Sequence, residues 1–315
     1  MSSKVVVLSG GVGGAKFTSG LSKVIQADKL TVIVNTGDDF EHLGLTICPD
    51  LDTITYTLAG LANPQTGWGR EGETWNFLEI LGELGGPTWF RLGDRDLALH
   101  HERTRRLRQG QSLTAITKHI CQAFGVSVTV LPMSDQPVRT IVITDEGELP
   151  FQDYFVSRQC EPRVNGFRFK GIETAEPAPG VLKAIRTAAV VLFCPSNPWV
   201  SLDPILALSG VREAIIEKVA VGVSPIIGGR ALRGPAAKMY RDLGIDPSAL
   251  AVAEHYRDLW DGYVIDQTDE ELVSKISSLG LRVMVTDTIM NTIDDRVQLA
   301  EKILTFASEM VLSEG

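Results

Sequence analysis

Short apolar runs alternate with helical patterns near both ends of the chain. The first run, Val5-Val6-Val7-Leu8, precedes apolar positions at helical spacing from Phe17 to Ile25, and a second run follows at residues 31–34. Later runs lie at 188–193, 219–223 and 282–285, and a helical pattern spans 292–307. Continuous apolar strands separated by amphipathic helices indicate a parallel sheet covered on both faces. We therefore predict an α/β protein with a Rossmann-like, doubly wound, mostly parallel sheet.

The middle of the chain does not show this alternation of apolar strands and helices. Residues 62–177 hold three of the five tryptophans, a basic stretch from His100 to Arg108, and short strand-like pieces at 138–143 and 166–170. Proline and glycine at 177–180 mark a return to the first pattern. We expect 62–177 to be an inserted mixed α/β subdomain, and 1–61 with 178–315 to form one nucleotide-binding core.

Composition excludes several classes of protein. Hydrophobic residues make up 44% of the 315 residues, and 30 basic against 39 acidic side chains give 30 − 39 = −9. This balance argues against a nonspecific duplex-DNA binder, which needs a basic face for the phosphates. No apolar run reaches the roughly 18 residues that cross a bilayer. Four scattered cysteines without a CxxC pair predict reduced thiols, so we expect a cytoplasmic protein with no nucleic-acid or membrane partner.

A glycine-rich loop follows the first predicted strand. Gly10, Gly11, Gly13 and Gly14 stand between this strand and a helix, where backbone N–H groups approach a phosphate at the helix N-terminus. The loop is not a dinucleotide fingerprint, because Lys16 stands where the last glycine belongs, and it lacks the P-loop spacing. We expect these four glycines to bind nucleotide phosphate; the alternative is a tight turn without a ligand.

Acidic residues gather after the second predicted strand. Asp38 and Asp39 come directly after it, and Asp50 and Asp52 follow within fifteen residues. Such a cluster suits a hard cation such as Mg²⁺. Asp38 could instead meet a ribose hydroxyl, and Asp50 or Asp52 could simply begin the next helix as its cap.

Two later loops resemble a second cradle for a phosphate or a sugar. Polar side chains and glycines follow the runs at 188–193 and 219–223, and the candidates are Ser196, Asn197, Ser201, Gly228 and Gly229. Arg230 or Arg233 would supply the counter-charge. Plain connecting turns are the alternative.

The charged stretch 91–96 reads, from its residues alone, as a helix start capped by Asp94. His100 and His101 read as surface residues of the basic helix rather than as metal ligands. The sequence has no GxSxG elbow, and no serine or cysteine has a partner histidine nearby. Acyl-enzyme chemistry is therefore not expected.

Taken as an ordered series, these motifs resemble the 2-phospho-L-lactate transferase family of coenzyme F420 biosynthesis, also called LPPG:Fo transferase. The matching stretches are Ser9–Gly14, Val34–Asp39, Pro49–Thr53, Leu92–Asp96, Leu131–Asp135, Pro195–Pro198 and Ser224–Gly228. The resemblance implies Mg²⁺-dependent transfer of a phospho-lactyl or phosphoenolpyruvyl unit from a guanosine-diphosphate-linked donor to the ribityl hydroxyl of the deazaflavin Fo. GMP would leave, and F420-0 or its dehydro form would result.

The resemblance also implies site residues. Fo would be bound by Asp50 or Asp52 and by Arg91 within an acceptor-binding insertion, and Trp68, Trp75 and Trp89 offer aromatic surface for its ring. We expect Asp38, Asp50 and Asp52 to be the catalytic residues, with Asp38 and Asp50 holding Mg²⁺. The competing function is a nucleotide- or nucleotide-sugar-binding regulator of the gluconeogenesis-factor type. The sequence does not identify the donor's acid (lactate, enolpyruvate or glycerate) or fix the oligomeric state, and a homodimer is compatible with it.

Overall fold

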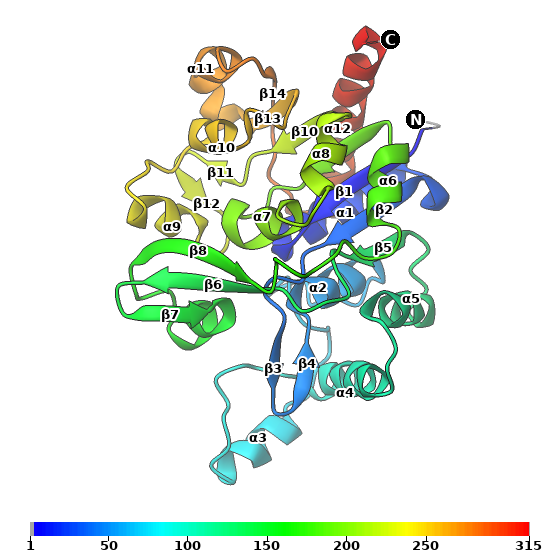
Figure 1. Cartoon of the computed structure of the whole chain (residues 1–315), viewed down its shortest axis with the longest axis vertical. Coiled ribbons are helices and arrows are strands. Elements are labelled where there is room, and N and C mark those ends of the chain that lie inside the picture. Colours follow the sequence, from blue (N-terminus) through cyan, green and yellow to red (C-terminus); the bar gives the residue numbers. More distant parts are fainter. Residues whose placement is uncertain (1–2, 315) are drawn as a thin grey trace.

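A seven-stranded parallel sheet forms the centre of the molecule, in a computed structural model that describes residues 3–314 (Figure 1). The strands lie in the order β14-β13-β10-β9-β1-β2-β5, and every described pair in this sheet is parallel. They are β1 (Val5–Ser9), β2 (Leu30–Val34), β5 (Thr129–Pro132), β9 (Val190–Phe193), β10 (Val219–Val223), β13 (Gly262–Asp266) and β14 (Arg282–Thr286). The predicted fold class, a doubly wound parallel sheet, is confirmed.

Helices cover both faces of this sheet. Successive side chains of a strand point to opposite faces, so each strand contributes to a separate hydrophobic cluster on each face. Val5 and Val7 of β1 belong to one buried cluster, whereas Val6 and Leu8 belong to the other. The first cluster includes residues of α1 (Gly11–Val24), α2 (Pro49–Leu58), α5 (Leu113–Ala123) and α12 (Ile293–Glu314). The second includes residues of α6 (Val181–Thr187), α7 (Asp203–Leu206), α8 (Val211–Ile216), α9 (Ala236–Asp242), α10 (Ala249–Tyr256) and α11 (Val273–Ser277).

Smaller elements stand beside the carboxyl ends of the strands. A three-stranded antiparallel sheet contains β6 (Arg139–Thr144), β7 (Gly147–Pro150) and β8 (Val164–Lys170), and two hairpins pair β3 (Phe40–His42) with β4 (Leu45–Ile47) and β11 (Ile226–Ile227) with β12 (Arg230–Ala231). Helices α3 (Asn76–Glu83) and α4 (Asp94–Arg108) lie at the end of the molecule opposite the C-terminus of α12 (Figure 1).

The structure differs from the sequence prediction in two places. Strand β5 pairs with β2 in the central sheet, although it lies inside the range 62–177 that we predicted as an insertion. Helix α5 lies in the same range and packs on the same sheet. Core elements therefore interrupt the insertion, and its division from the core otherwise stays a prediction. Strand β13 was not predicted, and α12 is longer than the predicted helix.

The strand order reverses direction between β1 and β9. Chain segments leaving β1 lead to β2 and β5 on one side, and segments leaving β9 lead to β10, β13 and β14 on the other. The loops that follow β1 and β9 therefore diverge and leave a crevice at the carboxyl edge of the sheet, where open α/β proteins bind their ligands.

Candidate functional site

A cavity of about 1110 Å³ occupies this crevice. The loops after β1, β2, β9, β10 and β14 line it, and segments of the range 62–177 close it from the other side. Its volume exceeds the roughly 300–1000 Å³ of a typical ligand pocket. The cavity can therefore hold two small molecules at once.

The glycine loop forms one wall of this cavity. Gly10, Gly11 and Gly13 line it, whereas Gly14 packs beneath the loop. A Cβ on Gly10 would lie 2.5 Å from Asp50 Oδ2 and 2.8 Å from Ser201 Cβ. A Cβ on Gly14 would lie 2.5 Å from Ser9 Oγ, so this glycine serves close packing rather than ligand contact. Glycine is thus required here by close approach of neighbouring chain segments.

Positive charge accompanies this loop. Helix α1 begins at Gly11 and presents its N-terminus to the cavity, which Lys16 and Arg233 also line. Lys16 Nζ donates a hydrogen bond to the carbonyl of Met290 at 2.8 Å. Burial lowers the pKa of Lys16, and the nearby charges of Arg296 and Arg233 lower it further. A helix N-terminus with unneutralised cations favours a phosphate group.

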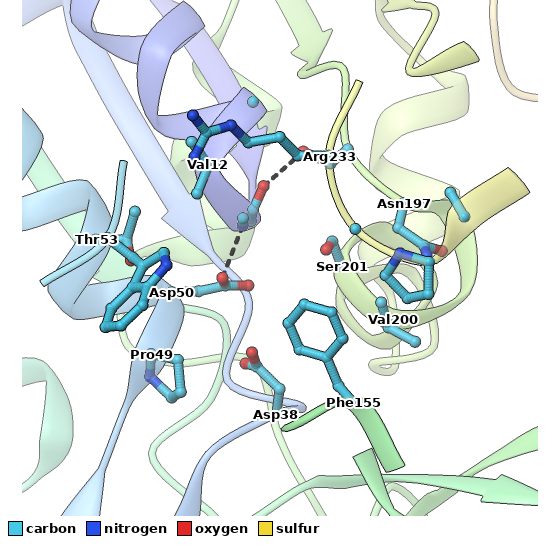
Figure 2. A pocket seen from close by; sticks show the side chains of 18 of the residues that line it. Val12, Asp38, Pro49, Asp50, Thr53, Phe155, Asn197, Val200, Ser201 and Arg233 are labelled. Atoms are coloured by element: carbon cyan, nitrogen blue, oxygen red, sulfur yellow. Dashed lines mark hydrogen bonds between the residues drawn. The ribbon is translucent and has the colours of Figure 1, made fainter. Parts of the chain in front are cut away.

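Two aspartates are held together beside the glycine loop. Asn35 Nδ2 donates to Asp50 Oδ2 at 2.9 Å and to Asp38 Oδ1 at 3.2 Å, and the backbone N–H of Gly11 donates to Asp50 Oδ1 at 2.7 Å. Both carboxyls are buried and line the cavity (Figure 2). Burial raises the pKa of Asp50 to about 6. Burial, and then the charge of Asp50, raise the pKa of Asp38 well above its usual range.

The chemistry of this pair fits a hard cation. Carboxylate oxygens are the ligands that Mg²⁺ prefers, and it commonly takes one or two carboxylates and completes its shell with water and substrate phosphates. Among residues 3–314, the structure contains no group of three or more His, Cys, Asp or Glu side chains placed for a metal. Asp38 and Asp50 are therefore the two candidate ligands, and the remaining ligands would have to come from solvent and substrate.

Asp52 lines the same cavity, but both of its carboxylate oxygens are bound by Arg103. Arg103 donates from Nη1 to Asp52 Oδ2 at 3.1 Å and from Nη2 to Asp52 Oδ1. Both residues are buried. Asp52 is thus committed to a bidentate ion pair, whereas Asp50 receives only neutral amide donors. Neither aspartate caps helix α2, whose N-cap is Cys48.

The later loops reach the cavity in part. Ser196, Asn197 and Ser201 line it, but two of them already have partners in the protein. Ser196 Oγ donates to the carbonyl of Gly10 at 2.7 Å, and Asn197 Oδ1 accepts from the backbone N–H of Trp199 at 3.1 Å. These two side chains fix the loops, whereas no hydrogen bond within the described residues occupies the hydroxyl of Ser201.

The predicted glycines Gly228 and Gly229 do not line the cavity in the part of the chain that the structure describes. They form the turn between β11 and β12 with positive φ, and the N–H of Gly228 donates to the carboxylate of Asp269 at 3.1 Å. Arg233, and not Arg230, provides the counter-charge at the cavity. The sequence pattern identified the right loop, but its residues on either side of the two glycines, such as Ile227 and Arg233, line the cavity instead.

Aromatic side chains line the far end of the cavity. Trp89 and Phe90 lie there beside Arg91, whose guanidinium stands 4.5 Å from the ring centre of Trp75. Trp68 also lines the cavity, but its neighbours Thr66 and Gly67 contact Arg233, so it stands nearer the glycine loop. Arg91 is exposed, and Trp75 itself does not line the cavity among the described residues. Phe155 reaches toward Asp38 and Asp50 from the antiparallel-sheet side (Figure 2). This end offers stacking surface and the guanidinium of Arg91.

Sequence reasoning missed several residues of the site. His100 is buried and lines the cavity instead of lying on the surface, whereas His101 is exposed. Gln152, which lies within the range 62–177, donates a hydrogen bond from Nε2 to Asp38 Oδ2 at 3.2 Å. Asp94 does cap a helix, but its carboxylate accepts from the backbone N–H groups of Asn76 and Phe77 at the start of α3 rather than α4. The spacing of His100 from Asp96 and Arg103 on one face of α4 was the signal that could have indicated its burial.

Within the described residues, no helix combines the length and the apolar character needed to cross a bilayer. The four cysteines are free, as predicted, and three of them are buried.

Comparison with known proteins agrees with this architecture. A phosphoenolpyruvate transferase of Streptomyces griseus is 42% identical over 315 residues, which cover 98% of this chain and 99% of the relative. A 2-phospho-L-lactate transferase of Methanothermobacter thermautotrophicus is 41% identical over 302 residues, covering 96% and 97%. A crystal structure of a Bacillus halodurans protein superposes with a TM-score of 0.62 at 16% identity, covering 96% of this chain and all of that one, which shows a shared fold.

The profile of the family described as 2-phospho-L-lactate transferase CofD matches residues 5–303, which is nearly the whole chain and includes every loop that lines the cavity. The resemblance seen in the sequence motifs is confirmed. The chain belongs to the 2-phospho-L-lactate transferase (CofD) family.

Proposed function

We propose that this transferase moves a phospho-lactyl or phosphoenolpyruvyl unit from a guanosine-diphosphate-linked donor to the ribityl hydroxyl of Fo, with release of GMP. One observation carries the proposal: a single cavity joins a phosphate-binding loop, a pair of buried aspartates and an aromatic end. Such a cavity can hold a nucleotide and a flat acceptor together, with the acidic pair between them. A regulator that binds only a nucleotide would have no use for the aromatic end.

The donor side is supported by the groups around α1. The N-terminus of this helix, the glycine loop, Lys16 and Arg233 are suited to a diphosphate, because fixed N–H groups and cations complement its charge. The loops after β10 and β14 continue the same wall beyond Lys16 and leave room for the nucleoside.

The chemistry that we propose is a direct displacement. The ribityl oxygen forms a bond to the phosphorus that carries the three-carbon acid, the bond from that phosphorus to the GMP oxygen breaks, and the hydroxyl proton passes to a carboxylate of the Asp38–Asp50 pair. Burial raises the pKa of Asp50 to about 6, which suits a proton acceptor near neutral pH. Mg²⁺, if held by the other carboxylate of the pair, would neutralise charge that develops on the phosphates.

The relatives do not decide which acid the donor carries. A relative named phosphoenolpyruvate transferase and one named 2-phospho-L-lactate transferase are 42% and 41% identical to this chain. The choice depends on a few atoms around a small acid, and both acids remain within the proposal.

Mass spectrometry of the products tests the proposal. The protein is incubated with Fo, Mg²⁺ and guanosine-linked donors that carry lactate, enolpyruvate or glycerate. We expect one donor to give a product with the mass of Fo plus the phospho-acid, together with an equal amount of GMP. Absence of GMP with every donor, in protein that still binds guanosine nucleotides, would favour a regulator instead.

A further inference from the structure

One buried face of α4 carries three polar residues next to the cavity. Asp96, His100 and Arg103 are spaced four and three residues apart, so they share one side of the helix. All three are buried, and Asp96 and His100 line the cavity near its aromatic end. Burying polar groups is costly unless each finds a hydrogen-bond partner.

Arg103 fixes the protonation of the His100 ring. Its Nη1 lies 3.3 Å from His100 Nδ1, and a guanidinium has only donors to offer. Asp52 Oδ2 also lies 3.5 Å from Nδ1, but it already accepts from Arg103 Nη1 at 3.1 Å. We therefore assign Nδ1 as the acceptor, which places the ring proton on Nε2. Burial lowers the pKa of His100 to about 4, so the ring is neutral at neutral pH.

The Nε2–H group of His100 is left without a partner. Among residues 3–314 no hydrogen-bond acceptor satisfies this buried atom, and the nearest carboxylate oxygen, Asp96 Oδ1, is 3.7 Å away. Asp96 Oδ1 instead accepts from the hydroxyl of Tyr56 at 2.6 Å. The cavity wall thus holds an unpaired donor, His100 Nε2–H, beside the carboxylate of Asp96. The second oxygen of that carboxylate, Oδ2, accepts no hydrogen bond within the described residues.

An unpaired buried donor gains a full hydrogen bond when a ligand supplies an acceptor. A donor beside an acceptor is complementary to a ring carbonyl next to a ring N–H, the edge of a lactam or an imide. Trp89 and Phe90 line the same cavity and suit a flat ring that carries such an edge.

We infer that His100 and Asp96 read the imide edge of the acceptor's pyrimidinedione ring, with His100 Nε2–H donating to a ring carbonyl and Asp96 accepting from the adjacent ring N–H. This inference rests on the proposed function, because Fo carries that edge at the end of its tricyclic system. Arg103 is a positioning residue in this arrangement, since it orients the His100 ring and touches no substrate.

The test compares Fo with an analogue methylated on the ring nitrogen between the two carbonyls. Fo is fluorescent, so binding of each compound to the intact protein is measured by fluorescence titration without turnover. The wild type should bind the methylated compound about tenfold or more weakly than Fo, because the methyl group removes the N–H and leaves Asp96 unpaired.

Two variants separate this role from a structural one. His100→Leu should weaken Fo binding by about tenfold, whereas His100→Gln, which keeps an N–H near the position of Nε2, should recover most of it. Arg95→Ala changes an exposed residue of the same helix that does not line the cavity, and it should bind both compounds like the wild type. Circular dichroism checks that each variant is folded. The comparison of Fo with its methylated analogue uses the wild type alone, so it does not depend on the folding of any variant.

The outcomes distinguish the two proposals. Equal affinity of the wild type for Fo and its methylated analogue would overturn the role of His100 and Asp96 and leave the transferase proposal standing. No binding of Fo to the wild type, even with GDP and Mg²⁺ present, would remove the acceptor itself and with it both proposals.

Discussion

Asp52 and Arg103 form a buried ion pair in which both carboxylate oxygens face the guanidinium, with one Nη1–Oδ2 distance of 3.1 Å. They are 51 residues apart in sequence, and the contact ties the start of α2 to α4. This relationship separates Asp52 from Asp50, its neighbour two residues earlier in the same helical turn. Asp50 lines the cavity and has no ion-pair partner among the described residues, whereas Asp52 fixes α4 to α2.

The first prediction follows from that separation. Asp50→Ala should lower turnover by ~10²-fold or more, the usual loss for a positioned charged group, and leave thermal stability nearly unchanged. Asp52→Ala should instead destabilise the fold by about 3–5 kcal/mol, because it leaves Arg103 buried without a counter-charge. Steady-state kinetics and urea unfolding measure the two effects.

The double variant Asp52→Ala/Arg103→Leu is the control for this pair. It removes both charges, so it should recover part of the stability that Asp52→Ala loses. A large loss of stability in Asp50→Ala, together with a stable but inactive Asp52→Ala, would exchange the two roles.

The second prediction concerns pH. Burial raises the pKa of Asp39 and of Asp96 to about 7, and that of Asp38 well above its usual range. A carboxyl with a raised pKa binds a proton in the folded state that the unfolded chain has already lost, so stability falls as pH rises through the folded pKa. The metal-free protein should therefore lose several degrees of Tm between pH 6.5 and pH 8.5.

This window lies at or above the ordinary histidine pKa, so the lowered pKa values of His42 and His100 contribute little to the change. Asp38→Asn should flatten the profile and exceed the wild type in Tm at pH 8.5. Mg²⁺ should raise the wild-type Tm more at pH 8.5 than at pH 6.5, because it binds the ionised pair. A metal-free Tm that rises across the window would contradict the assignment.

The sequence predicted the loops of the site but not how their side chains pair. Gly10 and Asp38 come directly after the parallel strands β1 and β2, and the ends of parallel strands meet at one edge of a sheet. Asp50 comes later, at the start of α2 after the β3–β4 hairpin. Arg103 and His100 lie in a helix that also carries exposed charges, such as that of Arg105. Only their spacing from Leu99 and Asp96 on one helical face indicated burial. Which aspartate Arg103 would meet depends on how α4 packs on α2, and no local pattern encodes that contact.

The turn at Gly228 and Gly229 illustrates the same limit. Its glycines are required by positive φ angles, which is a local property that the sequence reveals correctly. The direction in which the turn points depends on the hydrogen bonds of the Gly228 N–H to Asp269, 41 residues away. A glycine-rich turn at a strand end is therefore weaker support for ligand contact than one that also opens a helix.

The third prediction tests the close approach at Gly10. Gly10→Ala places a Cβ 2.5 Å from Asp50 Oδ2 and 2.8 Å from Ser201 Cβ, so Asp50 must move. Turnover should fall by about tenfold or more, since displacement of a positioned group by about an ångström is costly. Gly166→Ala in β8 is the matched control, because its Cβ would meet only Ile143 at 3.7 Å. Full activity in Gly10→Ala would show that the position of Asp50 is not critical.

The fourth prediction assigns Arg91 to the acceptor. Arg91→Ala should raise the KM for Fo by about tenfold and leave the affinity for guanosine nucleotides unchanged, because the residue lines the cavity next to Trp89 and Phe90 and stands over the ring of Trp75. The control is Arg95→Ala, which removes an equal charge outside the cavity. Calorimetry that shows lost GDP binding with intact Fo binding would reverse the assignment.

The last prediction concerns the order of bond making and breaking. Of the serines that line the cavity, Ser196 Oγ donates to the carbonyl of Gly10 and Ser224 Oγ to that of Ile226, and none has a hydrogen bond to a histidine in the described chain. No cysteine is among the residues that line the cavity in the described range. The hydroxyl of Fo should therefore attack directly, without a phosphoryl-enzyme intermediate, and the kinetics should be sequential.

Incubation with donor and Mg²⁺ alone should release GMP only at the slow rate of hydrolysis, and addition of Fo should start rapid release that EDTA stops. A burst of GMP equal to the amount of protein, with a matching gain in protein mass in the absence of Fo, would demonstrate a covalent intermediate and make Asp38 or Asp50 its first candidate as nucleophile.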